Sequence, residues 1–151
     1  MVFVVREIAH GSSEYSSSVQ LRHRVLREPL GLSFDASALA AEGKHVHIAA
    51  FTGPEPQALV VILVLTPDAQ PSSTGIKMRQ VAVASDCQRM GVGTETYAAA
   101  NGYTRIHMHA RVTAVAFYGV LGYSAVGDVS TEVSIPHIQM HKQLRGITCT
   151  N

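Results

Sequence analysis

Residues Val81–Thr94 read VAVASDCQRMGVGT and decide the fold, because a strand pattern changes into a helix pattern within them. The first four residues are small or β-branched and continue a predicted strand. Gly91 and Gly93 then permit a tight turn that brings backbone N–H groups close to a ligand. A helix is predicted over Val92–Ala100, and its first turn offers unpaired N–H donors with about half a positive charge. This connection therefore predicts a site for a phosphate or pyrophosphate group.

Two common phosphate-binding patterns do not fit this stretch. A dinucleotide fingerprint needs a third glycine at the position where Thr96 stands. A Walker loop needs Gly-Lys-Ser/Thr, which does not follow here. Arg89 adds a positive charge to the loop, but the residues alone also allow a strand–turn–helix connection in which the glycines serve only packing.

Hydrophobic patterns on both sides of this stretch extend the prediction to the whole chain. Strands are predicted at Val2–Ile8, His45–Phe51, Gln57–Leu65, Ile76–Ala84, Thr104–Arg111, Tyr123–Ile135 and His137–Leu144. Helices are predicted between Gly11–Ser18 and Pro29, at Asp35–Glu42, at Val92–Ala100 and at Ala114–Leu121. Thr113 is expected to cap the last helix, and Gln57–Leu65 is expected to be a central strand covered on both faces. The order predicts an α/β (α+β) domain with a mixed sheet, in which one helix forms the crossover of a parallel strand pair.

Composition limits the classes of protein and of partner. The chain has 151 residues, of which 46% are hydrophobic and 15% charged, so a single folded domain, 1–151, is expected. A net charge of +1 and 6% aromatic residues argue against nucleic acid or an anionic membrane as a partner. Its longest apolar run is far shorter than the roughly 20 residues of a spanning helix. Cys87 and Cys149 are too few for a disulfide scaffold, which favours a cytoplasmic protein.

Two sequence blocks occur in an order and spacing that go beyond local structure. Gln88-x-x-Gly91-x-Gly93 directly follows a strand, and His109–Tyr123 ends in Phe-Tyr-x-x-x-Gly-Tyr. Both blocks resemble the GNAT superfamily of N-acetyltransferases, the first its acetyl-CoA pyrophosphate loop and the second its strand-to-helix stretch. The resemblance covers nearly the whole chain. It implies a GNAT-like, mostly antiparallel central sheet of six to seven strands with helices on both faces.

The resemblance also implies acetyl-CoA as the cofactor and coenzyme A as a product. Backbone N–H groups of residues 89–94 would hold the pyrophosphate, and the pantetheine arm would lie along the preceding strand. A backbone N–H near Val83 would face the thioester carbonyl. Many members of the family have Asn at the position of Arg111, so this contact is either taken over by Arg111 or missing. The cofactor-binding residues are expected to be Val81, Val83, Gln88, Arg89, Met90, Gly91, Val92, Gly93, Thr94 and Arg111.

By the same resemblance, Tyr118 is the general acid that protonates the departing thiolate, although it also fits a half-buried aromatic residue beside Phe117. The general base stays open between a water chain and the side chains of Glu28, Glu42, His45, His47, His107, His109, His137 and His141. Arg22, Arg24 and Arg27 are expected to form a solvated helix face. No metal is expected, because the paired histidines have neither a Cys/His cluster nor a His-Glu-x-x-His motif.

The sequence therefore predicts an N-acetyltransferase. It would move an acetyl group from acetyl-CoA to a primary amine of a small molecule or peptide, by direct transfer in a ternary complex. A non-catalytic acyl-CoA-binding or regulatory module and a metal-binding protein built on the histidine pairs are the alternatives. The acceptor, the use of longer acyl groups and the oligomeric state stay open, and exposed strand edges are compatible with a homodimer.

Overall fold

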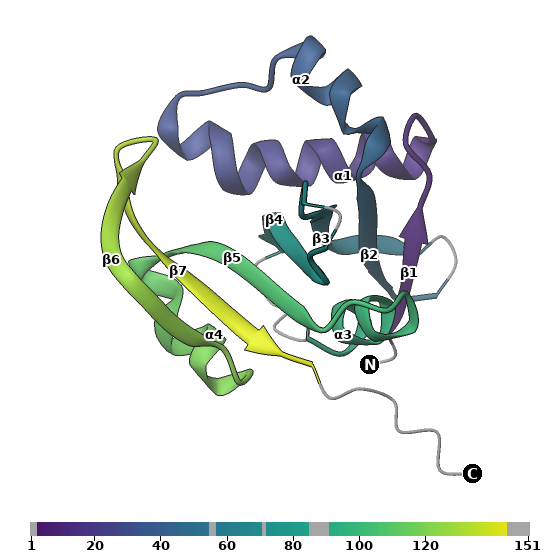
Figure 1. The fold of residues 1–151 in the computed structure, drawn as a ribbon. Helices are drawn as coiled ribbons and strands as arrows, with labels where there is room; N and C mark the ends of the chain where they lie inside the picture. The colour runs from purple at the N-terminus through teal and green to yellow at the C-terminus, as the bar shows by residue number, and fades with distance from the viewer. Residues whose placement is uncertain (1–2, 55–56, 71, 85–90, 145–151) are drawn as a thin grey trace, which may run out of the picture. The chain divides into compact units, whose positions relative to one another are not determined.

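The computed structural model describes residues 3–54, 57–70, 72–84 and 91–144. Seven strands within these residues form one sheet in the order β1-β2-β3-β4-β5-β7-β6 (Figure 1). The strands are β1 (Phe3–Ile8), β2 (Val46–Thr52), β3 (Ala58–Pro67), β4 (Gly75–Val83), β5 (Arg105–Arg111), β6 (Ser124–Glu132) and β7 (Ile135–Gln143). The pairs β1–β2, β2–β3, β5–β7 and β6–β7 are antiparallel, whereas β4 and β5 are parallel. The predicted mixed, mostly antiparallel sheet is confirmed.

Four α-helices lie between the strands in the predicted order, within the described ranges. They are α1 (Ser13–Arg22), α2 (Ala36–Ala41), α3 (Gly91–Ala100) and α4 (Val115–Val120). The crossover between the parallel strands β4 and β5 is α3, as predicted. The chain forms two compact units, one of Met1–Thr66 with Arg79–Thr94 and one of Pro67–Met78 with Glu95–Asn151.

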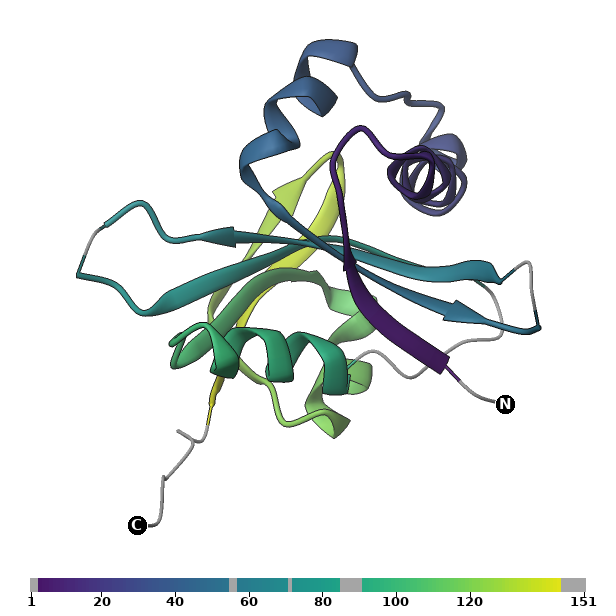
Figure 2. The same ribbon diagram turned by 90° about the vertical axis from the view of Figure 1, so that its right-hand side faces the viewer.

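The first unit is built from β1, β2, β3, the end of β4, α1 and α2. Five consecutive residues of β3, Val61–Leu65, are buried, as predicted for a strand covered on both faces. Hydrophobic side chains from these elements form the core cluster, which consists of Ile8, Leu21, Ala49, Phe51, Ile62 and Ala82. Helices α1 and α2 lie on the same side of the strands of this unit (Figure 2). Because Ala82 belongs to the core cluster, its neighbours Val81 and Val83 point to the opposite face of β4.

Helix α1 begins as the serine-rich stretch predicts and ends before Pro29, as predicted. The Ser12 side chain accepts a hydrogen bond from the backbone N–H of Tyr15 at 3.1 Å and caps the helix. The helical backbone then continues through a π turn, His23–Arg27, and a 3-10 turn, Glu28–Leu30. Pro29 lies in this separate 3-10 turn, where a proline near the start of a helix loses no hydrogen bond.

The second unit contains β5, β6, β7, the beginning of β4 and α4. Alternate residues of β5, namely Ile106, Met108 and Ala110, are buried, and polar side chains lie between them. Lys142 of β7 pairs with Ile106, and its Nζ donates to the backbone carbonyl of Leu121 just after α4 at 2.7 Å. Since paired residues share a face, α4 lies on the buried face of these strands.

The start of α4 differs from the prediction. A 3-10 turn, Val112–Ala114, precedes the helix, and Ala114 occupies the N-cap position without a side-chain hydrogen bond. Thr113 lies inside this turn, so the predicted cap by Thr113 is wrong. The 3-10 turn itself carries the chain from β5 into α4.

The hairpin between β6 and β7 also differs from the prediction. Its two turn residues are Val133 and Ser134, with φ angles of +50° and +62°. Two left-handed residues give a type I′ turn, whose twist matches that of the flanking strands. The predicted strand boundary at Pro136 is wrong, because Pro136 lies inside β7 and pairs with Thr131 of β6.

Candidate active site

The end of β4 carries two predicted cofactor contacts, Val81 and Val83, and both are half-buried. Gln80, directly before them, has φ +53°, a conformation that residues other than glycine seldom adopt. A left-handed residue inside a strand bends it and interrupts regular pairing. Beyond this point the N–H of Ala84 donates to the carbonyl of Val60 in β3 at 2.8 Å. The sequence did not indicate this bend, because glutamine has no preference for the left-handed region.

The first turn of α3 consists of Gly91–Thr94, four of the residues predicted to hold a pyrophosphate. The N–H groups in the first turn of a helix have no partner within it and lie at the positive end of its dipole. The observed start at Gly91 is one residue before the predicted Val92. Three further predicted contacts, Gln88, Arg89 and Met90, lie outside the described residues.

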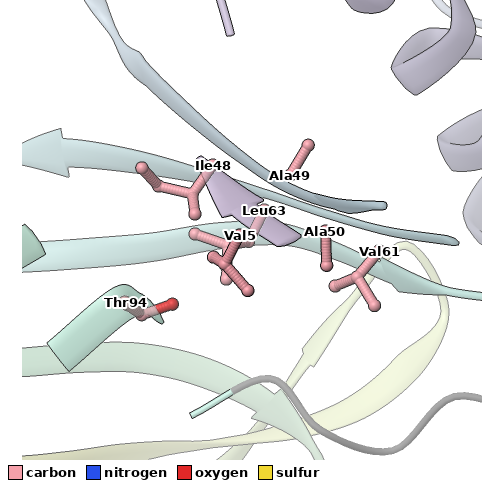
Figure 3. A pocket seen from close by; sticks show the side chains of 7 residues that line it. All are labelled: Val5, Ile48, Ala49, Ala50, Val61, Leu63 and Thr94. Atoms are coloured by element: carbon pink, nitrogen blue, oxygen red, sulfur yellow. The ribbon is translucent and has the colours of Figure 1, made fainter. Parts of the chain in front are cut away.

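Thr94 points from α3 toward the strands of the first unit (Figure 3). Its side chain is buried, and its Oγ1 has no hydrogen-bond partner in the described part of the chain. It faces a small pocket that is otherwise lined by Val5, Ile48, Ala49, Ala50, Val61 and Leu63. The pocket has room for about one water molecule and is too small for a nucleotide. The hydroxyl of Thr94 therefore faces the interior, and only the backbone N–H of this residue is available for the predicted contact.

Arg111 and Tyr118 lie close in sequence in the second unit. Arg111 is the last residue of β5, and Tyr118 lies in α4. The Tyr118 side chain is 7% exposed, and its ring packs edge-on against Phe117 and Tyr123, with centroid distances of 5.2 and 5.8 Å. Its backbone carbonyl accepts the N–H of Tyr123 at 3.1 Å, which fixes the end of the helix. Local packing thus holds Tyr118 in one orientation.

Burial raises the pKa of Tyr118 to about 12, because a phenolate in this position would lose its hydration. The phenol therefore stays protonated at neutral pH, as a general acid must. Complete proton transfer to a thiolate with a pKa of about 8.5 would be uphill by about 5 kcal/mol. For the predicted role of Tyr118 as general acid, this difference would favour a hydrogen bond donated to the sulfur while the C–S bond breaks over a proton transfer that precedes it.

Glu42, one of the predicted base candidates, is held by an arginine and a tyrosine. Arg22 donates from Nη1 and Nη2 to the two carboxylate oxygens at 2.8 and 2.6 Å, and the Tyr15 hydroxyl donates to Oε1 at 2.8 Å. Burial by itself would raise the pKa of Glu42, but the hydrogen bonds from Arg22 and Tyr15 lower it below its usual value of 4.5. A carboxylate with a lowered pKa and both oxygens occupied is a poor base.

The predicted solvated face of α1 is wrong for Arg22, whose side chain is 0% exposed. Its guanidinium lies 4.8 Å from the ring centre of Phe34, and that of Arg27 lies 4.9 Å from the same ring. Arg24 is exposed as expected. The buried Arg22–Glu42 pair therefore fastens the segment around α2 to α1 within the first unit.

His47 and His45 differ in how accessible they are. His47 is 1% exposed, and its Nε2 donates to the carbonyl of Glu42 at 3.1 Å, which leaves the lone pair on a buried Nδ1. Burial lowers the pKa of both histidines. A lone pair enclosed in this way cannot reach a substrate amine, so the geometry argues against His47 as the base. His45 is half-buried and Glu28 is exposed, and both remain predicted candidates for the base.

We expect His47 to make the fold less stable in mild acid. Its pKa in the fold is below the unfolded value of 6.5, so between these values only the unfolded chain takes up the proton. The stabilisation is complete above about pH 6.5 and decreases as the pH falls toward the folded pKa. Melting temperatures between pH 5 and 7.5 should therefore fall less steeply for His47→Gln than for the wild type. The control is His23→Gln, which replaces a half-buried histidine at the start of the π turn. Equal slopes for all three proteins would contradict the destabilising role of His47 in acid.

No three His, Cys, Asp or Glu side chains in residues 3–54, 57–70, 72–84 and 91–144 are arranged to hold a metal ion. No helix of the described chain combines the length and the apolar character that crossing a bilayer requires. Cys87 lies outside these ranges.

Solved structures share this fold at low sequence identity. A Lactobacillus plantarum protein assigned as an N-acetyltransferase has a TM-score of 0.77 and 22% identity, covering 96% of this chain and 100% of that one. Escherichia coli ElaA has a TM-score of 0.71 and 19% identity, with coverage of 93% and 99%. The ribosomal-protein-S18-alanine N-acetyltransferase of Escherichia coli has a TM-score of 0.69 and 11% identity, with coverage of 99% and 100%. At these identities the likeness shows the fold.

The sequence itself matches a known family over its second half. A family model described as an acetyltransferase (GNAT) domain matches residues 65–144, which is more than half of the chain. The match includes the end of β3, all of β4 and α3, and the stretch from β5 to β7. The chain therefore belongs to the GNAT family of acetyltransferases. It is an acyltransferase of the class that uses an acyl-CoA as co-substrate and acts on amines.

Proposed function

We propose that this protein transfers an acetyl group from acetyl-CoA to a primary amine of a small molecule or peptide, directly and in a ternary complex. The match of residues 65–144 to the GNAT domain carries the proposal, because it includes both the glycine-containing loop and the Phe-Tyr block. The low cysteine count supports the cytoplasm as its compartment.

Residues at two elements would bind the donor. The backbone N–H groups in the first turn of α3, Gly91–Thr94, suit the pyrophosphate. The buried side chain of Thr94 holds this turn in the first unit. The half-buried Val81 and Val83 would flank the pantetheine arm, with Arg111 as a further contact. When bound, acetyl-CoA supplies the acetyl group as an activated thioester. Gln88, Arg89 and Met90 complete the proposed loop contacts.

The reaction also requires two proton transfers, one from the amine nitrogen and one to the departing sulfur. A lysine-like amine with a pKa of about 10.4 is neutral in roughly one molecule in 2,500 at pH 7, which costs about 4.6 kcal/mol. A base that accepts the proton of the attacking amine therefore accelerates the reaction. Tyr118, protonated throughout the neutral range, would donate to the departing sulfur.

We expect the wild-type protein to bind acetyl-CoA in calorimetry and to release coenzyme A when amines are added. Spermidine, dopamine, free lysine and a peptide with an N-terminal alanine form a suitable first panel. Gly93→Asp should weaken acetyl-CoA binding at least about tenfold, because a carboxylate in the first turn of α3 repels the pyrophosphate. Thermal melting of the variant controls for loss of the fold.

Two other outcomes separate the alternatives. Binding of acetyl-CoA without product from a wide amine screen would favour the non-catalytic module. Absence of binding at millimolar acetyl-CoA would contradict the proposed function altogether. A homodimer stays a prediction, which light scattering of the purified protein would test.

A further inference from the structure

The strands β5 and β7 carry a row of polar side chains on one face of the second unit. The strand register pairs His109 with Gln139 and Arg111 with His137, and paired residues share a face. Met108, next to His109, is buried on the opposite face, where α4 lies. His109 therefore lies on the face of β5 that points away from α4.

Glu132, the last residue of β6, connects two of these histidines. Its Oε1 accepts the Nδ1–H of His109 at 2.5 Å, and its Oε2 lies 4.0 Å from Nε2 of His137. The His137 ring is held by its own Nδ1–H, which donates to the carbonyl of Ile135 at 2.8 Å. The hydrogen bond from His109 lowers the pKa of Glu132, so this side chain is a carboxylate at neutral pH.

The hydrogen bond to Glu132 decides which nitrogen of His109 can accept a proton. Because Nδ1 carries the hydrogen that faces the carboxylate, Nε2 holds the lone pair of the neutral ring. The His109 side chain is 39% exposed, so a solute can approach it. A carboxylate that orients an accessible imidazole is the arrangement that base catalysis requires. His47, whose lone pair is enclosed, has the opposite arrangement.

We propose that His109, oriented by Glu132, is the general base that accepts the proton of the acceptor amine. The proposal rests on the proposed function. The amine attacks in its neutral form: Nε2 of His109 takes one proton from the nitrogen as the C–N bond forms, and the electron pair of the breaking C–S bond leaves with the sulfur. Tyr118 supplies the proton that the sulfur needs. Solvent then returns a proton to Tyr118 and removes one from His109, so no further reactant is required.

The positions of the two groups suit their separate tasks. The base acts on the attacking nitrogen and the acid acts on the departing sulfur, which are different atoms bound to the same carbonyl carbon. Tyr118 belongs to α4, which lies on the buried face of β5 and β7, whereas His109 lies on the other face of the same strands. Both groups can reach one thioester only at the edge of β5 beyond its last pair with β4, Lys77–His107, and His109 lies just past this pair.

Several charged groups influence His109 and must be considered together. Glu132 from β6 accepts the Nδ1–H of His109. On β5 itself Arg111 and His107 are two residues away, and His107 donates to Asp68 at 2.6 Å. His137 from β7 and Lys77 from β4 both interact electrostatically with Glu132. Glu132 is the group in direct contact, so its replacement should change the orientation and the tautomer of His109 most.

Three variants separate these roles in the coenzyme A release assay with the amine panel, measured from pH 6 to 10. His109→Gln should lower kcat/KM at least about 100-fold. Glu132→Gln should lower it less, because the His109 ring remains but loses the carboxylate that orients it. His141→Gln, on the same face of β7 but opposite His107, is the matched control and should stay within about twofold.

A second measurement does not depend on the acceptor. Nitrogen-15 spectra of the labelled protein should show neutral His109 with its hydrogen on Nδ1, and Glu132→Gln should weaken this preference. Hydrogen on Nε2 in the wild type, or wild-type kcat/KM in His109→Gln, would overturn the proposal. Failure of the wild-type protein to bind acetyl-CoA would instead overturn the proposed function, and the role of His109 would fall with it.

Discussion

Replacement of Glu42 by alanine is expected to lower the free energy of unfolding by about 3–5 kcal/mol. The variant leaves the guanidinium of Arg22, which is 0% exposed, without its carboxylate partner. Neither the ring of Phe34 nor the enclosed protein interior replaces the lost hydration of a full charge. The Tyr15 hydroxyl loses its 2.8 Å acceptor at the same time. Chemical denaturation monitored by circular dichroism measures the effect.

Two comparisons make this prediction specific. Glu14→Ala removes an ion pair to Arg6 whose two side chains are 37% and 44% exposed, so it should cost less than about 1 kcal/mol. The double variant Arg22→Met with Glu42→Leu removes both charges and should be more stable than Glu42→Ala alone. Equal losses for Glu14→Ala and Glu42→Ala would contradict the buried pair.

The same pair predicts a pH dependence. The pKa of Glu42 is lower in the fold than its usual value of 4.5, so its contribution is complete above about pH 4.5. The contribution is lost as the pH falls through the folded pKa, because the native carboxylate must then take up a proton. Glu42→Ala should therefore have a flatter stability profile than the wild type below pH 4.5.

Replacement of Tyr118 by phenylalanine is expected to lower kcat by about 10²–10⁴-fold, the usual contribution of a proton donor. The phenylalanine ring keeps the edge-on packing with Phe117 and Tyr123 and removes only the hydroxyl. The affinity for acetyl-CoA should change little, because the hydroxyl is proposed to act on the departing sulfur. Steady-state coenzyme A release and calorimetry measure the two quantities separately.

The matched control is Tyr123→Phe, which removes another buried phenol from the same cluster and should retain most of the activity. Since burial raises the pKa of Tyr118 to about 12, the wild type should show no loss of activity from its ionisation up to about pH 10. Unchanged turnover in Tyr118→Phe would remove this residue from the mechanism.

Much of the fold could be predicted from local patterns. The strand Gln57–Leu65 was recognisable because a strand buried on both faces needs consecutive apolar residues. The start of α3 was recognisable because Gly91 and Gly93 interrupt the strand pattern. The β6–β7 turn was missed, since Val133 seldom adopts a left-handed conformation and Pro136 is the stronger turn signal.

The side-chain pairs could not be predicted from local patterns, because their members lie far apart in the sequence. Tyr15, Ser18 and Arg22 share one face of α1 at the spacing i, i+3 and i+7, but an arginine on such a face is normally read as exposed. Its burial depends on Glu42, which follows 20 residues later along the chain. The contact from His109 to Glu132 likewise depends on how three strands are aligned.

The amino-acid sequence by itself determined the elements, their order, the family and the loop that opens α3, because periodicity and glycine positions act over a few residues. Only the tertiary structure decided which charges are buried, which histidine lone pair is accessible and where β4 bends. Those properties follow from strand register and helix packing, which bring together groups far apart along the chain.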